Sequence, residues 1–515
     1  MTNEQTRDGH SEVLADHSTE GSEGMESVRW GSEAQATHCR EGEAGYNVSL
    51  EGTMGDTQRS QTISTETQGI AKQEAYDISG SPEDRAPLLV GESSLVRIKV
   101  LADRDPEMVF TSLVHRIDLH LLKKSFRQVR KSKSAGVDKV TAEQYAENLD
   151  ENLYNLHQRL RRGQYVATPV KRIWIDKEGG KKRPIGIPAL EDKIVQRAVS
   201  TVLAVVYDPI FHSFSHAFRK GHSQHKALAE LRDKCVKLNI NWIVSADITG
   251  LFDNIDHGLL RDLIKKRVND GGLLRLVGKW LNAGVMEGGD IHYPESGTPQ
   301  GGVISPMLSN IFLHYALDDW FVKQVKPRLY GRCFIIRWAD DFLIGCERKE
   351  DADRIMAVLP KRFERFRLNL HPEKTRLISF KRPGPGETTK GRTFDFLGFT
   401  FYWGKSLKGY GVIKKKTARK RLTRFMKRLW QWCKEFRHDP IKEQHQMLCS
   451  KLRGFYQYFG VRSNYKALEV VFEFAEETWR RWLGRRHRDG YISVEKFKRI
   501  RRSFPLPQPR IVHNI

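Results

Sequence analysis

The sequence predicts an α+β fold in which a body of mixed strands and helices is followed by an all-helical region. Short runs that alternate apolar and polar residues, such as "VKRIWIDKEGGKKRPIGIPAL" and "RCFIIRWADDFLIGC", occur between helical segments as far as about residue 403. After "KGYGVIKKKTARK" and as far as about residue 488, apolar residues recur at i, i+3, i+4 and i+7 beside many basic ones, which is typical of amphipathic helices. A chain of 515 residues is long enough to form several hydrophobic cores.

The expected elements follow in chain order. Residues 1–85 are rich in Ser, Thr, Glu, Gly and Gln, have sparse hydrophobic residues, and are expected to be a disordered acidic extension. Beyond them we expect helices from about 108, at about 141–162, at 191–206 and at 222–238, a hairpin at 170–190, a strand at 242–248 and a second hairpin at 334–344.

Charge is distributed unevenly along the chain. Of its 87 Lys and Arg and 63 Asp and Glu residues, the first 100 positions hold 8 and 18, a net charge of −10, so residues 101–515 carry +34. So large a charge opposes compaction unless a polyanion is the usual partner, and nucleic acid is the leading candidate. The alternative is a basic surface that only keeps the protein soluble.

Cysteine spacing and hydropathy exclude other classes. The six cysteines include no CxxC pair and no Cys/His cluster with metal-ligand spacing, which argues against a disulfide scaffold or a zinc module. The amino terminus has no basic-then-apolar signal pattern, and no apolar run reaches about 18 residues. Secretion and membrane spanning are therefore not expected.

Three aspartates form the candidate catalytic centre. Asp247 follows the apolar run 243–246, and Asp340 and Asp341 fall at the tip of the hairpin expected at 334–344. Carboxylates on a strand end and on a neighbouring hairpin would make an oxygen-rich pocket for two Mg²⁺ ions, which could activate a 3′-hydroxyl and stabilise a leaving pyrophosphate. The alternative is that Asp340 and Asp341 serve only the turn, which aspartate favours.

Seven sequence blocks, in order, resemble those of a group II intron reverse transcriptase. They are "KEGGKKRPIGIPALEDKIVQRA", "SHAFRKGHSQHKAL", "ADITGLFDNIDH", "SGTPQGGVISPMLSNIFLHYALD", "RWADDF", "LHPEKTRLISF" and "FDFLGFTF". The similarity runs from about 108 to 403, and the later "LRGFYQYFGV" resembles the maturase or thumb region of that family.

The resemblance implies a right-hand polymerase, with fingers and palm built on antiparallel sheet and an all-α three-helix thumb or maturase domain. The expected organisation is 1–85 disordered acidic extension, 86–240 N-terminal helical extension and fingers, 241–403 palm with the catalytic aspartates, 404–490 helical thumb or maturase domain, and 491–515 basic C-terminal tail.

The resemblance also implies roles around the nucleotide. Asp247, Asp340 and Asp341 would hold the metal ions, with the Ile248 carbonyl as a further ligand. Residues expected at the nucleotide are Lys177 and Arg183 at the triphosphate, Phe252 beneath the sugar, Gln300 and Gly301 in the loop under the dNTP and template, and Lys374 in a later palm block. An aromatic face at Phe252 would favour deoxynucleotides, whereas the alternative for Phe252 is ordinary core packing.

Two further sets would hold the nucleic acid. Phe396, Leu397, Gly398 and Phe399 match the primer grip of the family, with plain core packing as an equal interpretation for the two Phe residues. Basic residues on the first C-terminal helix would contact phosphates; they are Arg419, Lys420, Arg424, Lys427 and Arg428.

The sequence departs from the family pattern at several positions. It lacks the paired cysteines of an HNH-type endonuclease module, so no endonuclease activity is expected. Thr249 replaces a common lysine, and Ala217 replaces a usual glycine. Trp338 stands where the family usually has tyrosine, and its only donor is the indole N–H on a larger ring. We expect polymerisation to survive and nucleotide insertion or fidelity to shift; a tolerated aromatic swap is the alternative.

The predicted function is an RNA-directed DNA polymerase that also binds the intron RNA and assists its splicing and mobility. Its cofactor would be two Mg²⁺ ions, with Mn²⁺ as a substitute, and its partners an intron RNA template, a DNA primer or target and dNTPs, without a membrane. The family suggests a cytoplasmic, nucleoid-associated location in a bacterial-type cell. A domesticated reverse transcriptase in host defence or repair, and an RNA-binding splicing cofactor with a vestigial polymerase site, are the alternatives. The sequence leaves the oligomeric state open.

Overall fold

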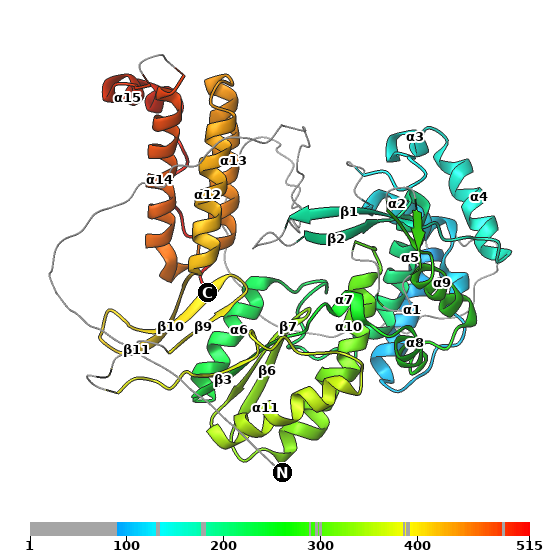
Figure 1. The fold of residues 1–515 in the computed structure, drawn as a ribbon. Helices are drawn as coiled ribbons and strands as arrows, with labels where there is room; N and C mark the ends of the chain where they lie inside the picture. Colours follow the sequence, from blue (N-terminus) through cyan, green and yellow to red (C-terminus); the bar gives the residue numbers. More distant parts are fainter. Residues whose placement is uncertain are drawn as a thin grey trace, which may run out of the picture. The chain divides into compact units, whose positions relative to one another are not determined.

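The computed structural model describes residues 90–129, 134–176, 182–287, 290–293, 297, 301–384, 387, 392–486 and 490–515. The extension expected to be disordered, residues 1–85, lies outside these ranges. Over the described part the fold is α+β, as predicted: strands form three sheets, and helices surround them and continue beyond them (Figure 1).

Helix caps divide the amino-terminal helices differently from the prediction. The helix expected from about 108 begins only at α2 (Leu119–Gln128), because the Asp118 carboxylate accepts a hydrogen bond from the Leu121 amide at 2.7 Å and caps it there. The helix expected at 141–162 is two helices, α3 (Ala142–Glu147) and α4 (Leu149–Arg161), separated at Asn148 by a non-helical backbone. Before them lies α1 (Val90–Arg104).

The hairpin expected at 170–190 is part of the first sheet, here called the hairpin sheet. Strands β1 (Val170–Asp176) and β2 (Lys182–Ile187) are antiparallel, as predicted. β4 (Val285–Glu287) pairs with β1 in parallel, and β5 (Asp290–His292) pairs with β4, which gives the order β2-β1-β4-β5. The sheet is therefore mixed rather than purely antiparallel.

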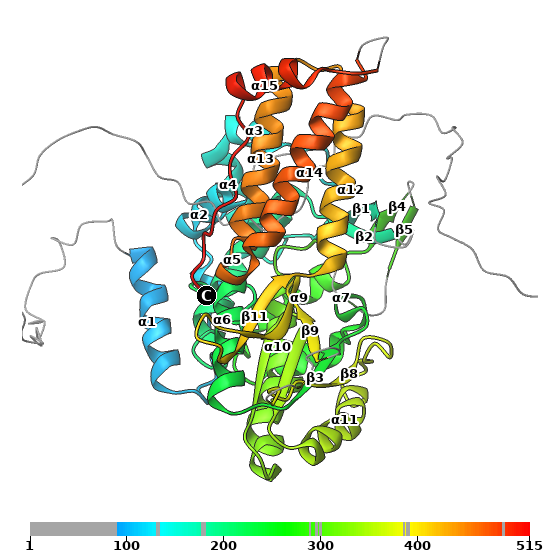
Figure 2. The same cartoon turned by 90° about the vertical axis from the view of Figure 1, so that its left-hand side faces the viewer.

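A four-stranded antiparallel sheet, here called the central sheet, has the order β6-β7-β3-β8. Its strands are β3 (Trp242–Asp247), β6 (Cys333–Trp338), β7 (Asp341–Cys346) and β8 (Arg376–Ser379). Side chains alternate between two cores: Ile243 and Leu343 pack with α6 (Gln224–Lys237), whereas Val244 and Ile344 share a core with α11 (Lys349–Glu364). Two helices thus cover opposite faces of the sheet (Figures 1 and 2).

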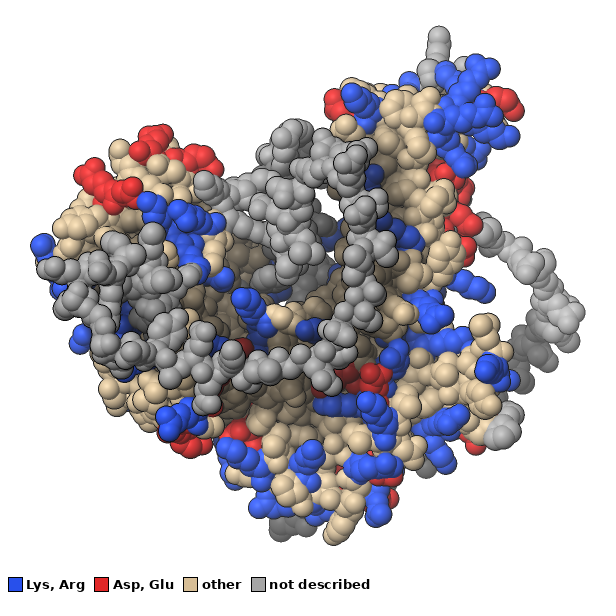
Figure 3. Space-filling model, turned by 180° about the vertical axis from the view of Figure 1, so that it is seen from behind, with Lys and Arg blue, Asp and Glu red and all other residues tan. Residues whose placement is uncertain are grey.

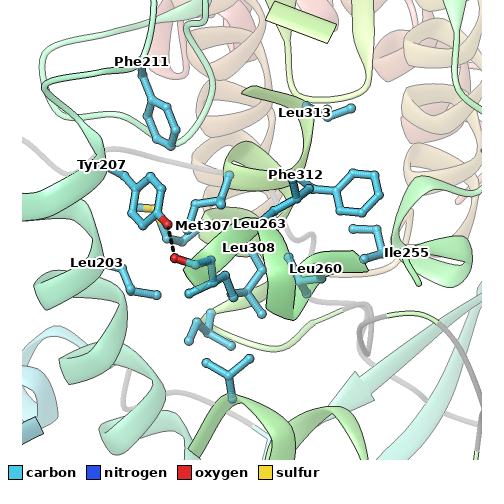
Figure 4. Packing of buried hydrophobic residues seen from close by; sticks show 14 of the residues in the cluster. Leu203, Tyr207, Phe211, Ile255, Leu260, Leu263, Met307, Leu308, Phe312 and Leu313 are labelled. Atoms are coloured by element: carbon cyan, nitrogen blue, oxygen red, sulfur yellow. Dashed lines mark hydrogen bonds between the residues drawn. The ribbon is translucent and has the colours of Figure 1, made fainter. Parts of the chain in front are cut away.

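Buried hydrophobic residues between α5 (Leu190–Tyr207), α8 (His257–Lys265) and α10 (Ser305–Leu313) form the largest core (Figure 4). Leu203, Leu260 and Leu308 interdigitate there, and the Tyr207 hydroxyl donates a hydrogen bond to the Ile264 carbonyl at 2.8 Å, so that its buried polar end is paired. After α10 the chain continues as a π-helix, His314–Asp318. Helices α7 (Leu251–Asn254) and α9 (Gly271–Leu281) contribute buried residues to the same core.

The third sheet has the order β11-β10-β9, with β9 (Thr393–Phe396), β10 (Phe399–Lys405) and β11 (Gly411–Thr417). The region from 404 was expected to be helical, and that expectation is wrong for β11. In "GVIKKKT" every second residue from Ile413 to Thr417 is buried, as in a strand, so the second of the three lysines, Lys415, is buried. Helices begin only at Arg419.

Three long helices follow, α12 (Arg419–Glu435), α13 (Ile441–Phe459) and α14 (Tyr465–Gly484), around a shared hydrophobic core. The range 491–515 was expected to be a basic tail, but it contains α15 (Val494–Ser503) and an extended segment beside the helices (Figure 2). The amides of Val512 and His513 donate hydrogen bonds to the Gly460 carbonyl, and the His513 ring stacks on His225 of α6 at 3.6 Å. Among the described residues, no helix has the length and apolarity needed to span a bilayer.

Candidate active site

The three candidate catalytic aspartates meet at one end of the central sheet. Asp247 is the last residue of β3, and Asp341 is the first residue of β7; the two are direct partners in the antiparallel register. Trp338 on β6 also pairs with Asp341, so Ala339 and Asp340 form a two-residue turn. The structure therefore places Asp340 in the hairpin turn and Asp341 on the strand.

The turn has an unusual backbone that a buried arginine holds. Ala339 has a φ of 55°, in the left-handed region that non-glycine residues seldom adopt. The guanidinium of Arg337 is fully buried, and its Nη1 donates a hydrogen bond to the Ala339 carbonyl at 3.1 Å. Arg337 is in turn held by Asp318, which accepts two hydrogen bonds at 2.8 and 2.6 Å.

Two further polar groups complete this network. Arg337 Nη2 donates to Ser215 Oγ at 2.6 Å, and Nη1 donates to Asn310 Oδ1 at 3.1 Å. Sequence reasoning missed Arg337, although a charged residue inside the apolar run "CFIIRW" is a signal that it has a buried partner. Its hydrogen bonds join the Ala339 carbonyl to three side chains outside the hairpin, which makes it a positioning residue for the turn that carries Asp340.

Burial and mutual repulsion make these carboxylates unusual. The pKa of Asp341 is raised to about 7 by burial, by the negative charge of Asp340 and by that of Asp247. The positive charges of Lys374 and Arg421 act in the opposite direction. Burial is also the largest cause that raises the pKa of Asp340, and Arg183 and Lys374 oppose it. An all-oxygen, like-charged group of this kind suits hard divalent cations such as Mg²⁺ and would be stabilised by them.

Lys374 contacts a candidate metal ligand directly. Its Nζ lies 2.5 Å from Asp247 Oδ2. The segment before β8 that carries Lys374 is fixed to β3, because the His371 amide donates to the Asp247 carbonyl and the Thr249 amide donates to the Asn369 carbonyl, both at 2.8 Å. These bonds flank the buried Ile248 without using its carbonyl, so that oxygen is not consumed by this pairing.

Of the other residues expected to contact the nucleotide, the structure describes Arg183 and Phe252 but not Lys177 and Gln300. Arg183 lies on β2 of the hairpin sheet, and its charge acts on Asp340. Phe252, on α7, is half-buried and does not belong to the buried core, contrary to the core-packing alternative. Lys177 and Gln300 lie outside the described residues, so their positions stay predictions.

Gly301 approaches the hairpin sheet closely. Its φ is 112°, and a Cβ at this position would lie 2.4 Å from the Gly186 carbonyl oxygen on β2. A residue with a side chain would therefore clash with the backbone of the strand that carries Arg183. The glycine lets the loop before α10 lie against β2.

The expected primer grip is a tight turn. Phe396 and Phe399 pair across β9 and β10, and both are buried, in keeping with the core-packing interpretation. Leu397 and Gly398 form the turn between them, with φ values of 48° and 77° that suit a two-residue hairpin connection. The Tyr458 hydroxyl of α13 donates a hydrogen bond to the Leu397 carbonyl at 2.8 Å, which fixes the turn against the helices.

The five basic residues expected at phosphates all lie on α12. Arg419, Lys420, Lys427 and Arg428 are exposed, and Arg424 is half-buried. Lys and Arg side chains are spread over much of the face shown in Figure 3. A basic surface of this kind attracts a polyanion without reading its sequence.

Comparisons with known proteins agree with this geometry. Residues 175–401, which contain all three aspartates, match the family model described as reverse transcriptase (RNA-dependent DNA polymerase). The chain is 37% identical over 241 residues to the group II intron-encoded protein LtrA of Lactococcus lactis subsp. cremoris, covering 45% of this chain and 39% of LtrA. It is 34% identical over 206 residues to protein YkfC of Escherichia coli K12, covering 39% of this chain and 53% of YkfC.

A plant relative is more distant. Nuclear intron maturase 4, mitochondrial, of Arabidopsis thaliana is 30% identical over 157 residues, covering 29% of this chain and 19% of that protein. The chain thus covers between about a fifth and about half the length of these three curated relatives.

Proposed function

We propose, because this chain belongs to the reverse transcriptase family of group II intron-encoded proteins, that it is an RNA-directed DNA polymerase. The observation that supports this most directly is the convergence of Asp247, Asp340 and Asp341 at one end of the central sheet. A polymerase whose site had become vestigial would have no need to keep three mutually repelling carboxylates together.

The three aspartates would hold two Mg²⁺ ions, with the Ile248 carbonyl as a further ligand and Mn²⁺ as a substitute. When bound, these ions would activate the 3′-hydroxyl of the primer and stabilise the charge on the leaving pyrophosphate. Arg337 keeps the Ala339–Asp340 turn in place throughout, so that the carboxylates need little reorganisation during the reaction.

Basic residues would neutralise the incoming triphosphate. Arg183 and Lys177 are proposed to bind its phosphates, since a guanidinium can bind a phosphate through two hydrogen bonds. Lys374, which is paired with Asp247, would exchange this carboxylate for a nucleotide phosphate. Phe252 would lie beneath the sugar, and the loop at Gln300 and Gly301 would support the base pair.

The helices α12, α13 and α14 are proposed to form the thumb, which would grip the template–primer duplex through phosphate contacts of α12. The Leu397–Gly398 turn would contact the primer, because Phe396 and Phe399 are packed in the core and leave the turn as the accessible part. The relationship to an intron maturase and an intron-encoded protein favours a second role for this surface, in binding the intron RNA and assisting splicing.

Primer extension on an RNA template with dNTPs and Mg²⁺ tests the polymerase proposal. We expect extension by the wild type and its loss in Asp340→Asn and in Asp341→Asn. Asp262→Asn, at an exposed position on α8 whose carboxylate pairs with Lys265, is the matched control and should extend normally. A wild type that makes no DNA over a range of templates, or an Asp340→Asn variant that extends at the wild-type rate, would refute the proposal.

A further inference from the structure

Three side chains outside the candidate active site can reach a common ligand. His212 lies on the segment after α5, whereas His314 and Asp319 lie at the two ends of the π-helical stretch after α10. One ligand atom of each lies within 4.8 Å of the others, and His212 Nε2 is 3.1 Å from Asp319 Oδ1. For metal–ligand bonds of about 2.0–2.1 Å, ligand atoms of a tetrahedral ion lie about 3.3 Å apart, so this spacing is suitable.

The π-helix is what brings His314 and Asp319 together. In an α-helix, residues five apart differ by about 140° around the axis and face different sides. Here the Asp319 amide donates its hydrogen bond to the His314 carbonyl, five residues earlier, so the wider turn places both on nearly one side. Single π turns of this kind are frequently found at functional sites.

The surroundings favour an imidazole with a free nitrogen. His314 is 3% exposed, and its Nδ1 has no hydrogen-bond partner among the described residues. An imidazole nitrogen that is buried without a hydrogen-bond partner is available to bind a metal ion. The rings of Phe211 and Phe214 pack on His314 and His212, which limits the directions these imidazoles can take.

The carboxylate is also oriented. Asp319 Oδ2 is 2.7 Å from Lys323 Nζ, which leaves Oδ1 toward His212. A hydrogen bond to the other oxygen of a ligating carboxylate is the usual way in which proteins orient such a ligand. The Lys323 side chain is 63% exposed, so its ammonium can rotate into solvent if a cation is bound nearby.

We propose that His212, His314 and Asp319 bind a divalent transition-metal ion of the zinc class. Two imidazoles and one carboxylate with an open fourth position are typical ligands for such ions, whereas Mg²⁺ prefers oxygen ligands alone. The site is therefore chemically distinct from the three-aspartate centre, and it does not depend on the polymerase proposal. Its neighbour Asp318 holds Arg337, so an ion here would stiffen the same stretch that supports the Ala339–Asp340 turn.

Calorimetric titration with Zn²⁺ tests the proposal. The full chain is first stripped of metal ions, and excess Mg²⁺ is then added so that it occupies the three aspartates in competition with Zn²⁺. We expect one Zn²⁺ per chain, and an affinity at least about tenfold weaker in His212→Gln and in Asp319→Asn. His120→Gln, at an exposed histidine on α2, is the matched control and should bind like the wild type. Co²⁺ should give visible absorption bands of a low-coordinate site in the wild type, and these should be lost in the same two variants.

His314 is almost fully buried, so His314→Gln can fail to fold. The His212 and Asp319 side chains are 24% and 21% exposed, so Zn²⁺ binding is compared in the variants of these two residues instead. Near-UV circular dichroism of each variant checks that the fold is intact.

A second histidine cluster is the alternative location for the Zn²⁺ ion. The Nδ1 atoms of His216 and His222 lie 3.1 Å apart, and the carboxylate of Glu230 lies beside His216. Wild-type Zn²⁺ affinity in both His212→Gln and Asp319→Asn, or binding lost only in His222→Gln, would overturn the proposal.

Discussion

Removal of Arg337 should destabilise the protein strongly, because it would leave Asp318 as an unpaired buried charge. Both side chains are fully buried and lie 2.6 Å apart. Removing one partner of a buried ion pair costs about 3–5 kcal/mol, a large part of the total stability of about 5–15 kcal/mol that is usual for a domain. We expect this loss in Arg337→Met and a similar one in Asp318→Leu.

The double variant separates the charge effect from the positioning effect. Replacing both charges by apolar side chains removes the unpaired charge, so Arg337→Met with Asp318→Leu should be less destabilised than Arg337→Met alone. It still leaves Ser215, Asn310 and the Ala339 carbonyl without their arginine partner, at about 1–3 kcal/mol for each group left unsatisfied.

Chemical denaturation followed by tryptophan fluorescence measures the stability, and primer extension measures the effect on the turn. If Arg337 positions the turn, the folded double variant should extend primers much more slowly than the wild type. Arg332→Met, which removes an exposed ion pair with Glu347 in the same hairpin, is the control and should change neither measurement appreciably. A loss below about 1 kcal/mol in Arg337→Met, or normal extension by the double variant, would refute this reasoning.

Four further predictions follow from single contacts. Gly301→Ala should reduce primer extension, because its Cβ would lie 2.4 Å from the Gly186 carbonyl oxygen and push the loop off β2. Trp338→Tyr should alter the misincorporation rate in an extension assay that omits one dNTP, because it replaces the indole N–H by a phenol on a smaller ring. Lys415→Met should stabilise the protein at neutral pH: burial lowers the pKa of Lys415 to about 8, and its ammonium has no hydrogen-bond partner among the described residues. Wild-type stability should accordingly rise between about pH 8 and 10.5, where the unfolded chain binds more protons, and this rise should be absent in the variant. Lys420→Ala should weaken RNA binding and reduce the slope of log affinity against log salt by about one.

Each of these has a matched control or a contrary outcome. Gly278→Ala adds a Cβ with no heavy atom within 4 Å and should leave extension unchanged. Identical error rates for Trp338→Tyr and wild type would leave the tolerated swap as the explanation. A Lys415→Met variant with the wild-type pH dependence would show that the lysine is not the group that titrates. Lys349→Ala, at an exposed position on α11, should keep the salt slope if α12 carries the phosphate contacts.

The sequence was sufficient to predict the similarity to reverse transcriptases and the hairpin that carries two of the candidate catalytic aspartates. Alternation around Asp340 and Asp341 predicted the hairpin and its position, and residues 175–401 match the reverse transcriptase model, in agreement with the ordered blocks. The α+β class is confirmed as well, because strand-like and helical periodicities are strong over most of the chain.

Features that depend on contacts across the chain were beyond sequence reasoning. β11 was missed because a lysine-rich segment reads as a solvated surface, whereas Lys415 is buried. The partners of Arg337 come from segments far apart in the sequence, so no local pattern reveals them. His314 and Asp319 fall on different sides at the α-helical period, and only the π turn brings them together.

The pairing of β3 with β7 has a consequence for how the protein folds. The two strands that carry Asp247 and Asp341 are neighbours in the central sheet, but they are far apart in the chain. Between them lie the helices α7, α8, α9 and α10 and, among other elements, the strands β4 and β5 of the hairpin sheet. Closing so long a loop is entropically costly, and contacts between distant segments form slowly. The candidate catalytic carboxylates should therefore be among the last groups to come together, so that recovery of primer extension during refolding lags behind recovery of the helical signal.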